Sequence, residues 1–244
     1  MNGIADLLNE TNHRSWPIPL KKWSYYQEWN NAVFLHWKVP VEELTKYTPE
    51  DMEIDSIDGE YWISVVAFTM QKMRPRMLPS VAFISDFHEI NVRTYLTHDN
   101  KTGVYFLDIE AEKWLSANLA RAISTLPYQT AKMKRSKDVA LNTYTSSNAK
   151  SGFIFNTQYS IGEEITNKSA LDIWLTERYC LYLNKGNTIS QYEIHHKPWK
   201  LFQIDFSLLD VQFKIGNISL NRKPDIAHYS TGVQVIAWER VRLI

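Results

Sequence analysis

The stretch from Asp86 to Leu96 constrains the fold more than any other part of this chain, because its residue types alternate with a period of two. Such a period predicts a β-strand. One face would carry Phe87, Glu89, Asn91, Arg93 and Tyr95, and the other His88, Ile90, Val92, Thr94 and Leu96. The first face is polar, so it would either meet water or line a polar cavity. The alternation leaves both possibilities open.

Two opposite charges on this face cannot neutralise each other. Glu89 and Arg93 are four residues apart, which is about 13 Å on a strand that rises ~3.3 Å per residue. Each side chain therefore needs another partner: a group on a neighbouring strand, water or a ligand.

Length and composition favour one folded domain. The chain has 244 residues, of which 44% are hydrophobic and 13% aromatic, which is enough for a sizeable core and argues against disorder. Residues 1–14 are polar and are expected to form an N-terminal arm, either a short helix or disordered. Residues 15–244 are expected to form a single domain, because β-rich domains of this size are often undivided.

Charge and cysteine content limit the classes of partner and the cellular compartment that we expect for this protein. Lys plus Arg and Asp plus Glu are both 27, without the basic excess that is typical of nucleic-acid binding. Cys180 is the single cysteine, which excludes an internal disulfide and fits a reducing compartment. The sequence shows neither a signal-peptide pattern nor an apolar run long enough to span a membrane. We therefore expect a cytoplasmic protein with no nucleic-acid or membrane partner, and homo-oligomers are possible.

Strand patterns dominate the remainder of the chain. Helices are expected at 41–47, at 111–125 and from Ser169 to about Arg178, where Asp172 completes a capping box. Asp58-Gly59 predicts a hairpin turn between strands at 52–57 and 60–70. Further strands are expected at 32–37, 104–109, 128–134, 139–144, 153–159, 179–183, 191–195, 201–215 and 233–241. The predicted fold class is α+β, with two or three helices around a large antiparallel sheet or barrel.

Local motifs support no familiar cofactor or metal chemistry. The histidines are scattered, and the adjacent pair His195-His196 would point to opposite faces of a strand. The sequence contains neither a glycine-rich nucleotide loop nor a Gly-x-Ser-x-Gly elbow. We expect no cofactor and no metal.

The polar strand face and a helix-to-strand corner form the candidate site. The helix expected at 111–125 carries Arg121, and Tyr128 and Gln129 follow where the chain re-enters a strand. Together with Glu89, Asn91 and Arg93 they could line a pocket for a small, anionic carboxylate or carbonyl ligand. Arg93 would be the anion anchor.

Several motifs resemble the YqjF-like family of uncharacterised proteins, in family order over nearly the whole chain. They are His13-Arg14-Ser15-Trp16-Pro17-Ile18-Pro19, Phe34-Leu35-His36-Trp37-Lys38-Val39-Pro40, Asp58-Gly59-x-x-Trp62, Glu89-Ile90-Asn91-Val92-Arg93-Thr94-Tyr95, Gly103-Val104-Tyr105-Phe106, Leu126-Pro127-Tyr128-x-x-Ala131-x-Met133, Glu177-Arg178-Tyr179, His196-x-Pro198-Trp199, and His228-Tyr229 before Val235-x-x-Trp238.

The resemblance implies a fold and a departure in chemistry. The family is similar to acetoacetate decarboxylase, so it implies an antiparallel β-barrel with flanking helices and a small internal pocket. In that enzyme a pocket lysine forms a Schiff base with a β-keto acid. The corresponding Pro-Lys-Lys positions fall on Pro127, Tyr128 and Gln129, which cannot form an imine, whereas the pocket glutamate falls on Glu89.

Three readings follow from the resemblance. The preferred one is a small-molecule-binding barrel, or an enzyme that works without a Schiff base, in which Glu89 is an acid, a base or a hydrogen-bond acceptor. The second is a Schiff-base lyase that uses another lysine, for which Lys132 and Lys134 are the nearby substitutes. The third is a structural or interaction protein whose pocket is filled by side chains.

Overall fold

A large mixed β-sheet organises the computed structural model, which describes residues 2–112, 128–138, 141–185 and 188–243. Its strands are β1 (Tyr25–Val39), β2 (Glu53–Ile54), β3 (Tyr61–Pro75), β4 (Phe87–His98), β5 (Lys101–Ala111), β6 (Tyr128–Thr130), β7 (Lys132–Lys137), β8 (Asn142–Asn148), β9 (Phe153–Glu164), β10 (Cys180–Lys185), β11 (Thr188–His196), β12 (Phe202–Gln212), β15 (Ile226–Ala237) and β16 (Val241–Arg242). A separate pair is formed by β13 (Lys214–Ile215) and β14 (Ile218–Ser219). The described helices are α1 (Asn2–Asn9), α2 (Val41–Leu44), α3 (Ala82–Ser85) and α5 (Ala170–Thr176).

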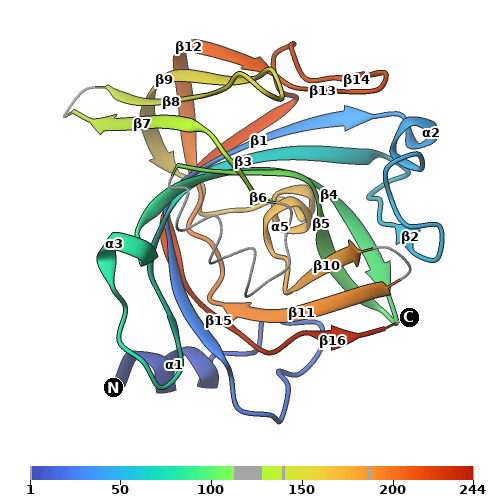
Figure 1. The fold of residues 1–244 in the computed structure, drawn as a ribbon, viewed down its shortest axis with the longest axis vertical. Helices are drawn as coiled ribbons and strands as arrows, with labels where there is room; N and C mark the ends of the chain where they lie inside the picture. Colours follow the sequence, from blue (N-terminus) through green and yellow to red (C-terminus); the bar gives the residue numbers. More distant parts are fainter. Residues whose placement is uncertain (1, 113–127, 139–140, 186–187, 244) are drawn as a thin grey trace.

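Seven of the strands pair in a closed circuit, seen end-on in Figure 1. The order is β1-β3-β4-β5-β10-β11-β15, and β15 pairs again with β1. All of these pairings are antiparallel except that of β5 with β10, which is parallel. The expected α+β class with a large sheet is therefore found. The expectation that the sheet is antiparallel is wrong, because β5 also pairs in parallel with β6.

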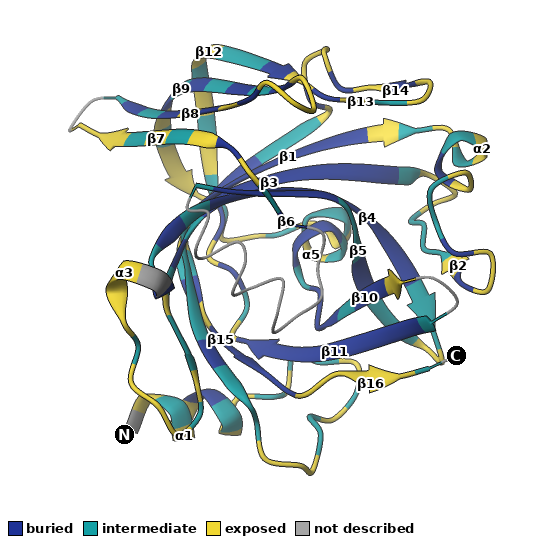
Figure 2. Ribbon diagram, in the orientation of Figure 1, coloured by how far each residue is buried: buried dark blue, intermediate teal, exposed yellow. Residues whose placement is uncertain are grey.

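A second layer covers the outer face of the circuit. Strand β15 continues through β12, β9 and β8 to β7, and this layer lies above β1 and β3 in Figure 1. Apolar side chains fill the space between the layers, among them Val33 and Leu35 of β1, Ile90 and Val92 of β4, and Tyr144, Phe155 and Tyr159 of β8 and β9. Figure 2 accordingly shows long buried stretches of β1, β3 and β4. The alternation of β4 thus has an apolar side because that side is a sheet-to-sheet interface.

Turn and cap signals in the sequence locate several elements. Asp58 and Gly59 both adopt positive φ, as a tight hairpin turn requires, although only Ile57 and Glu60 bridge across it. The strand expected before the turn is reduced to β2, which pairs with β4 rather than with β3. Ser169 caps α5 and forms the expected capping box with Asp172.

Other boundaries differ from the expectations. Helix α2 ends at Leu44, and the strand expected at 201–215 is divided between β12 and β13. Ala111, expected in a helix, is the last residue of β5, and the rest of that expected helix lies almost entirely outside the described residues. None of the described helices is long and apolar enough to cross a membrane.

The N-terminal segment is packed against the sheet. Leu7 of α1 is fully buried and lies in a cluster with Tyr26, Ile236 and Trp238. Farther along, Arg14 donates a hydrogen bond from Nη1 to the Ile194 carbonyl oxygen at 2.7 Å. Of the two states considered for residues 1–14, a short helix is the one observed.

Candidate functional site

The polar face of β4 lines an internal cavity of about 150 Å³. Glu89, Asn91 and Arg93 are only 3%, 3% and 8% exposed, so this face does not meet bulk water. Strand pairing places them there, because Glu89 lies opposite Phe68 of β3 and Asn91 lies opposite Val66, and both of these residues belong to the core inside the circuit. An acid, an amide and a guanidinium therefore share a buried, mainly apolar environment.

Glu89 has few compensating partners for a buried carboxyl group. Its oxygens accept hydrogen bonds from the Tyr128 hydroxyl at 3.0 Å and from Asn91 Nδ2 at 3.2 Å. Burial penalises the charged form and raises the pKa of Glu89 to about 7, although both hydrogen bonds oppose this shift. Near neutral pH this group can therefore give or take a proton.

Arg93 is a buried cation that has no counter-ion among the described residues. No carboxylate oxygen of the described residues lies within 4.0 Å of its guanidinium, and its Nε is buried without a hydrogen-bond acceptor. The aromatic ring of Phe34 has its centroid 6.0 Å from Arg93 Cζ. Burial lowers the pKa of Arg93, but an arginine stays protonated in proteins. The positive charge is thus available to an anion in the cavity.

Arg178 is a second buried guanidinium at the cavity, and the sequence interpretation did not include it. Its Nη1 lies 2.5 Å from Asp55 Oδ2, and its Nε donates to the Trp174 carbonyl oxygen at 2.7 Å. Its Nη2 is buried without an acceptor in the described part of the chain. The motif Glu177-Arg178-Tyr179 was the sequence pattern that could have indicated Arg178 as a site residue. The position just after α5 decides that its arginine faces inward.

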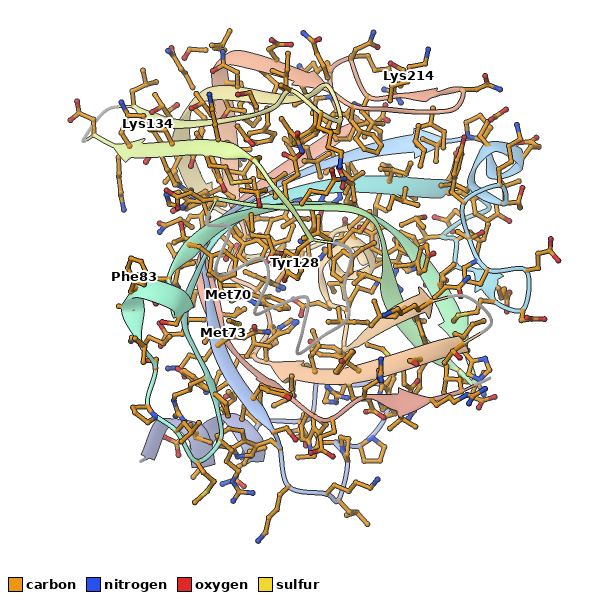
Figure 3. All side chains as sticks on the ribbon, viewed as in Figure 1. Met70, Met73, Phe83, Tyr128, Lys134 and Lys214 are labelled. Carbon is orange, nitrogen blue, oxygen red and sulfur yellow. The ribbon has the colours of Figure 1, made fainter. Side chains whose placement is uncertain are left out.

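Aromatic side chains form most of the remaining wall. Trp29 and Trp199 stack with ring centroids 6.2 Å apart, and Phe34 packs edge-on to Trp199 at 5.0 Å. Trp29 Nε1 is buried without an acceptor among the described residues. In Figure 3 Tyr128, Met70 and Met73 lie on the inner side of the circuit, and all three line the cavity.

A chain of buried hydrogen bonds lies next to Arg93 in the same layer. Ser64 is the direct neighbour of both Arg93 and His36 across the sheet, and its Oγ lies 2.6 Å from His36 Nδ1 and 2.5 Å from the Tyr95 hydroxyl. Because Tyr95 donates to the Leu175 carbonyl oxygen, Ser64 donates to Tyr95 and His36 Nδ1 donates to Ser64. Burial and the neighbouring Arg93 and His228 hold the pKa of His36 well below its usual range, so His36 is neutral.

The other expected site residues divide between the cavity and elsewhere. Tyr128 lines the cavity with Glu89. Gln129 does not, because neighbouring strand residues face opposite sides, and its Nε2 donates to Asp108 Oδ1 at 2.9 Å. Arg121 lies outside the described residues. In the described chain, no group of three or more His, Cys, Asp or Glu side chains could hold a metal ion.

The lysines considered as Schiff-base substitutes do not reach the cavity. Lys132 and Lys134 are exposed on β7, and Figure 3 places Lys134 at the outer layer, away from Tyr128. The described residues that line the cavity include no lysine. The third reading, a structural or interaction protein, stays a prediction, although the described residues leave a cavity of about 150 Å³.

Fold and site together define an α+β protein with a cavity that holds buried ionisable side chains. The chain belongs to the DUF2071 family, described as "Uncharacterized conserved protein (COG2071)", whose model matches residues 26–234. It is 33% identical to the Uncharacterized protein YqjF of Bacillus subtilis (strain 168) over 225 residues, which cover 91% of this chain and 93% of that protein.

Solved structures resemble the chain in fold at low sequence identity. An acetoacetate decarboxylase-like enzyme from Sphingomonas wittichii RW1 aligns with a TM-score of 0.61 and 12% identity, covering 92% of this chain and 94% of that one. The enduracididine biosynthesis enzyme MppR complexed with pyruvate aligns with a TM-score of 0.62 and 8% identity, covering 94% and 93%. The fold is therefore acetoacetate decarboxylase-like.

Proposed function

We propose that this protein binds a small carboxylate or carbonyl compound in its internal cavity, within an acetoacetate decarboxylase-like barrel, and acts without a Schiff-base lysine. Arg93 is the anion anchor, Arg178 orients it or the ligand, and Glu89 with Tyr128 forms a proton-exchanging pair. The protein is proposed to work in the cytoplasm.

The observation that carries the proposal is Arg93, a buried guanidinium that has no carboxylate partner among the described residues and lines a cavity. Burial of an unpaired charge costs several kcal/mol, roughly, in a protein interior. A ligand anion would offset this cost and would accept hydrogen bonds from the guanidinium. The protein of similar fold that is described as complexed with pyruvate gives further support, because pyruvate is a small carboxylate with a carbonyl group.

Glu89 supports an acid–base role beside that anion. A carboxyl group with a pKa of about 7 is half protonated near neutral pH. In its protonated form it leaves the cavity positively charged and can donate a hydrogen bond to a ligand carbonyl oxygen. In its ionised form it can accept a proton from a ligand carbon or water.

Native mass spectrometry of the purified protein, followed by calorimetric titration with a panel of small carboxylates, tests binding. We expect a bound acid or a carboxylate that titrates to one site, and an affinity loss of at least about 10-fold in Arg93→Met, since hydrogen bonds to charged groups contribute about 1.5–3 kcal/mol. Arg222→Met is the matched control, because Arg222 is half exposed and pairs with Asp225 on the surface. Equal affinities of Arg93→Met and wild type would contradict the assignment.

Borohydride trapping with keto acids and aldehydes tests the absence of a Schiff base. We expect no reduced lysine adduct in the wild-type protein or in Tyr128→Phe. A lysine-borne adduct, located by peptide mass spectrometry, would establish the Schiff-base reading instead.

A further inference from the structure

We propose that the ligand is an aromatic monocarboxylic acid with a single ring, whose carboxylate meets Arg93 and whose ring lies against the aromatic wall of the cavity. This inference rests on the proposed function and deepens it by naming the ligand class. It combines the charge of Arg93, the aromatic side chains of the lining and the volume of the cavity.

The charges of the lining residues fit one carboxylate rather than two. Arg178 is already paired with Asp55. Arg74 also lines the cavity, but it is half-buried and donates a hydrogen bond to the Arg76 carbonyl oxygen at 3.3 Å. Arg93 is therefore the buried guanidinium that has no ion pair among the described cavity residues. Glu89 lines the same cavity and would repel a second anionic group once ionised. Its partner Asn91 keeps an oxygen, Oδ1, that is buried without a donor in the described part of the chain, and another acceptor there would worsen that deficit.

The aromatic wall of the cavity is suited to contact a flat ring. Phe34, Phe68 and Phe106 line it together with Trp29 and Trp199. These groups already meet one another edge-on, tilted and stacked, as in the 5.7 Å tilted contact between Trp29 and Phe68. Ring faces and edges prefer the same offset or edge-on contacts with a further ring.

Two methionines complete this wall on the side of β3. Met70 and Met73 line the cavity, and Met70 belongs with Tyr128 to one core cluster, against which Met73 packs. Thioether sulfur makes favourable contacts with aromatic rings and fills irregular gaps around them. This arrangement favours an aromatic body over an aliphatic one of equal size.

The volume limits the ligand to one ring. A cavity of about 150 Å³ is the size that holds benzene in an engineered apolar site. The proposed ligand is therefore of the size of benzoate or a small ring-substituted relative. A two-ring acid would exceed this volume.

Competition between matched acids tests the class by calorimetric titration of the full chain. We expect benzoate to bind about 2- to 10-fold more tightly than cyclohexanecarboxylate, since aromatic contacts contribute about 0.5–1.5 kcal/mol beyond buried area. Phthalate, with a second carboxylate, and benzyl alcohol, with none, are each expected to bind at least about 10-fold more weakly than benzoate.

Variants of the wall connect the preference to its residues. Trp29→Leu should bring the ratio of benzoate to cyclohexanecarboxylate affinity close to one while both acids still bind. Phe68→Leu provides a second test if Trp29→Leu does not fold, and Phe213→Leu, in the outer layer, is the control that should leave the ratio unchanged.

The outcomes distinguish the inference from the proposed function. If cyclohexanecarboxylate or phthalate binds as tightly as benzoate and Arg93→Met weakens it, the aromatic monocarboxylate class is wrong and the anion site stands. If no carboxylate binds, or Arg93→Met binds each acid as well as wild type, the proposed function fails as well.

Discussion

Glu89 and Glu110 are two buried carboxyl groups on neighbouring strands. Their pKa values are raised to the same extent, but their hydrogen-bond partners and the space around them differ. Glu110 of β5 lies opposite Ile90, the residue next to Glu89, so the two side chains project from opposite faces of one sheet. Burial raises the pKa of each to about 7. Glu89 faces the cavity, whereas Glu110 faces the outer layer of strands.

The difference lies in how fully the surroundings satisfy each carboxyl group. Glu110 accepts hydrogen bonds from Asn148 Nδ2 at 2.8 Å, Ser151 Oγ at 3.3 Å and Ser146 Oγ at 3.4 Å, which tie β5 to β8 and the turn after it. Glu89 accepts two, lines a cavity and shares that cavity with Arg93, which has no ion pair among the described residues. A raised pKa alone therefore does not identify a functional site; unoccupied space and unsatisfied neighbouring groups do.

The pH dependence of stability should show both groups. A carboxyl pKa that is raised in the folded state contributes stability that is complete below the unfolded pKa of 4.5 and is lost as pH rises through about 7. For Glu89 this loss amounts to about 3 kcal/mol. Urea unfolding from pH 4.5 to 8 should therefore show a free energy of unfolding that falls, relative to the Glu89→Gln/Glu110→Gln variant.

The difference curve is the informative quantity, because buried histidines act in the opposite direction. Burial lowers the pKa of His36, His195, His196 and His228. Their contribution to the free energy of unfolding therefore decreases as the pH is lowered below 6.5. Parallel curves for the wild type and the double variant would contradict the raised pKa values of the two glutamates.

Among single substitutions, Glu110→Leu should distinguish most clearly the structural role of Glu110 from the ligand-site role of Glu89. It leaves Asn148, Ser146 and Ser151 without their acceptor, and we expect a loss of about 3 kcal/mol in the free energy of unfolding by urea titration. Affinity for carboxylates should change less than 2-fold, roughly, since Glu110 does not line the cavity. A large change in affinity with unchanged stability would reverse the roles given to the two glutamates.

Arg93→Met should have effects opposite to those of Glu110→Leu: higher stability without ligand and lower affinity for carboxylates. Because the guanidinium has no carboxylate partner in the described chain, an apolar side chain of similar length should raise the stability of the ligand-free protein by about 1–2 kcal/mol. Thermal unfolding with and without a carboxylate measures this: the variant should melt higher without ligand and gain nothing from it. A variant less stable than wild type would assign Arg93 a structural role.

Tyr128→Phe should have the smallest effect. The substitution removes the 3.0 Å hydrogen bond to Glu89, with an expected loss of about 1 kcal/mol in stability and a further rise in the pKa of Glu89. The pH midpoint of carboxylate binding reports this rise. Tyr182→Phe is the control, because its hydroxyl donates to the Lys101 carbonyl oxygen away from the cavity. An unchanged midpoint would contradict the coupling.

The sequence was sufficient to predict the site residues on β4 but not Arg178. Strict alternation was sufficient to place Glu89, Asn91 and Arg93 on one face, since a strand turns successive side chains by half a turn. The same rule excludes Gln129 once Tyr128 faces inward. The inward position of Arg178 depends on how α5 and β10 meet the sheet, and β10 pairs in parallel with β5 through Leu181 and Val104, far apart in sequence. Such long-range pairing leaves no local pattern to read.

Closure of the strand circuit has a consequence for the synthesis of this protein. The strand that completes the circuit, β15, follows the other six circuit strands in the chain, and it pairs with β1, which precedes them, as well as with β11. Until β15 emerges from the ribosome, β1 and β11 each present an unpaired edge, and the cavity has no complete wall. Folding should therefore be slow, with high contact order, and the nascent chain should depend on chaperones to protect those edges from aggregation.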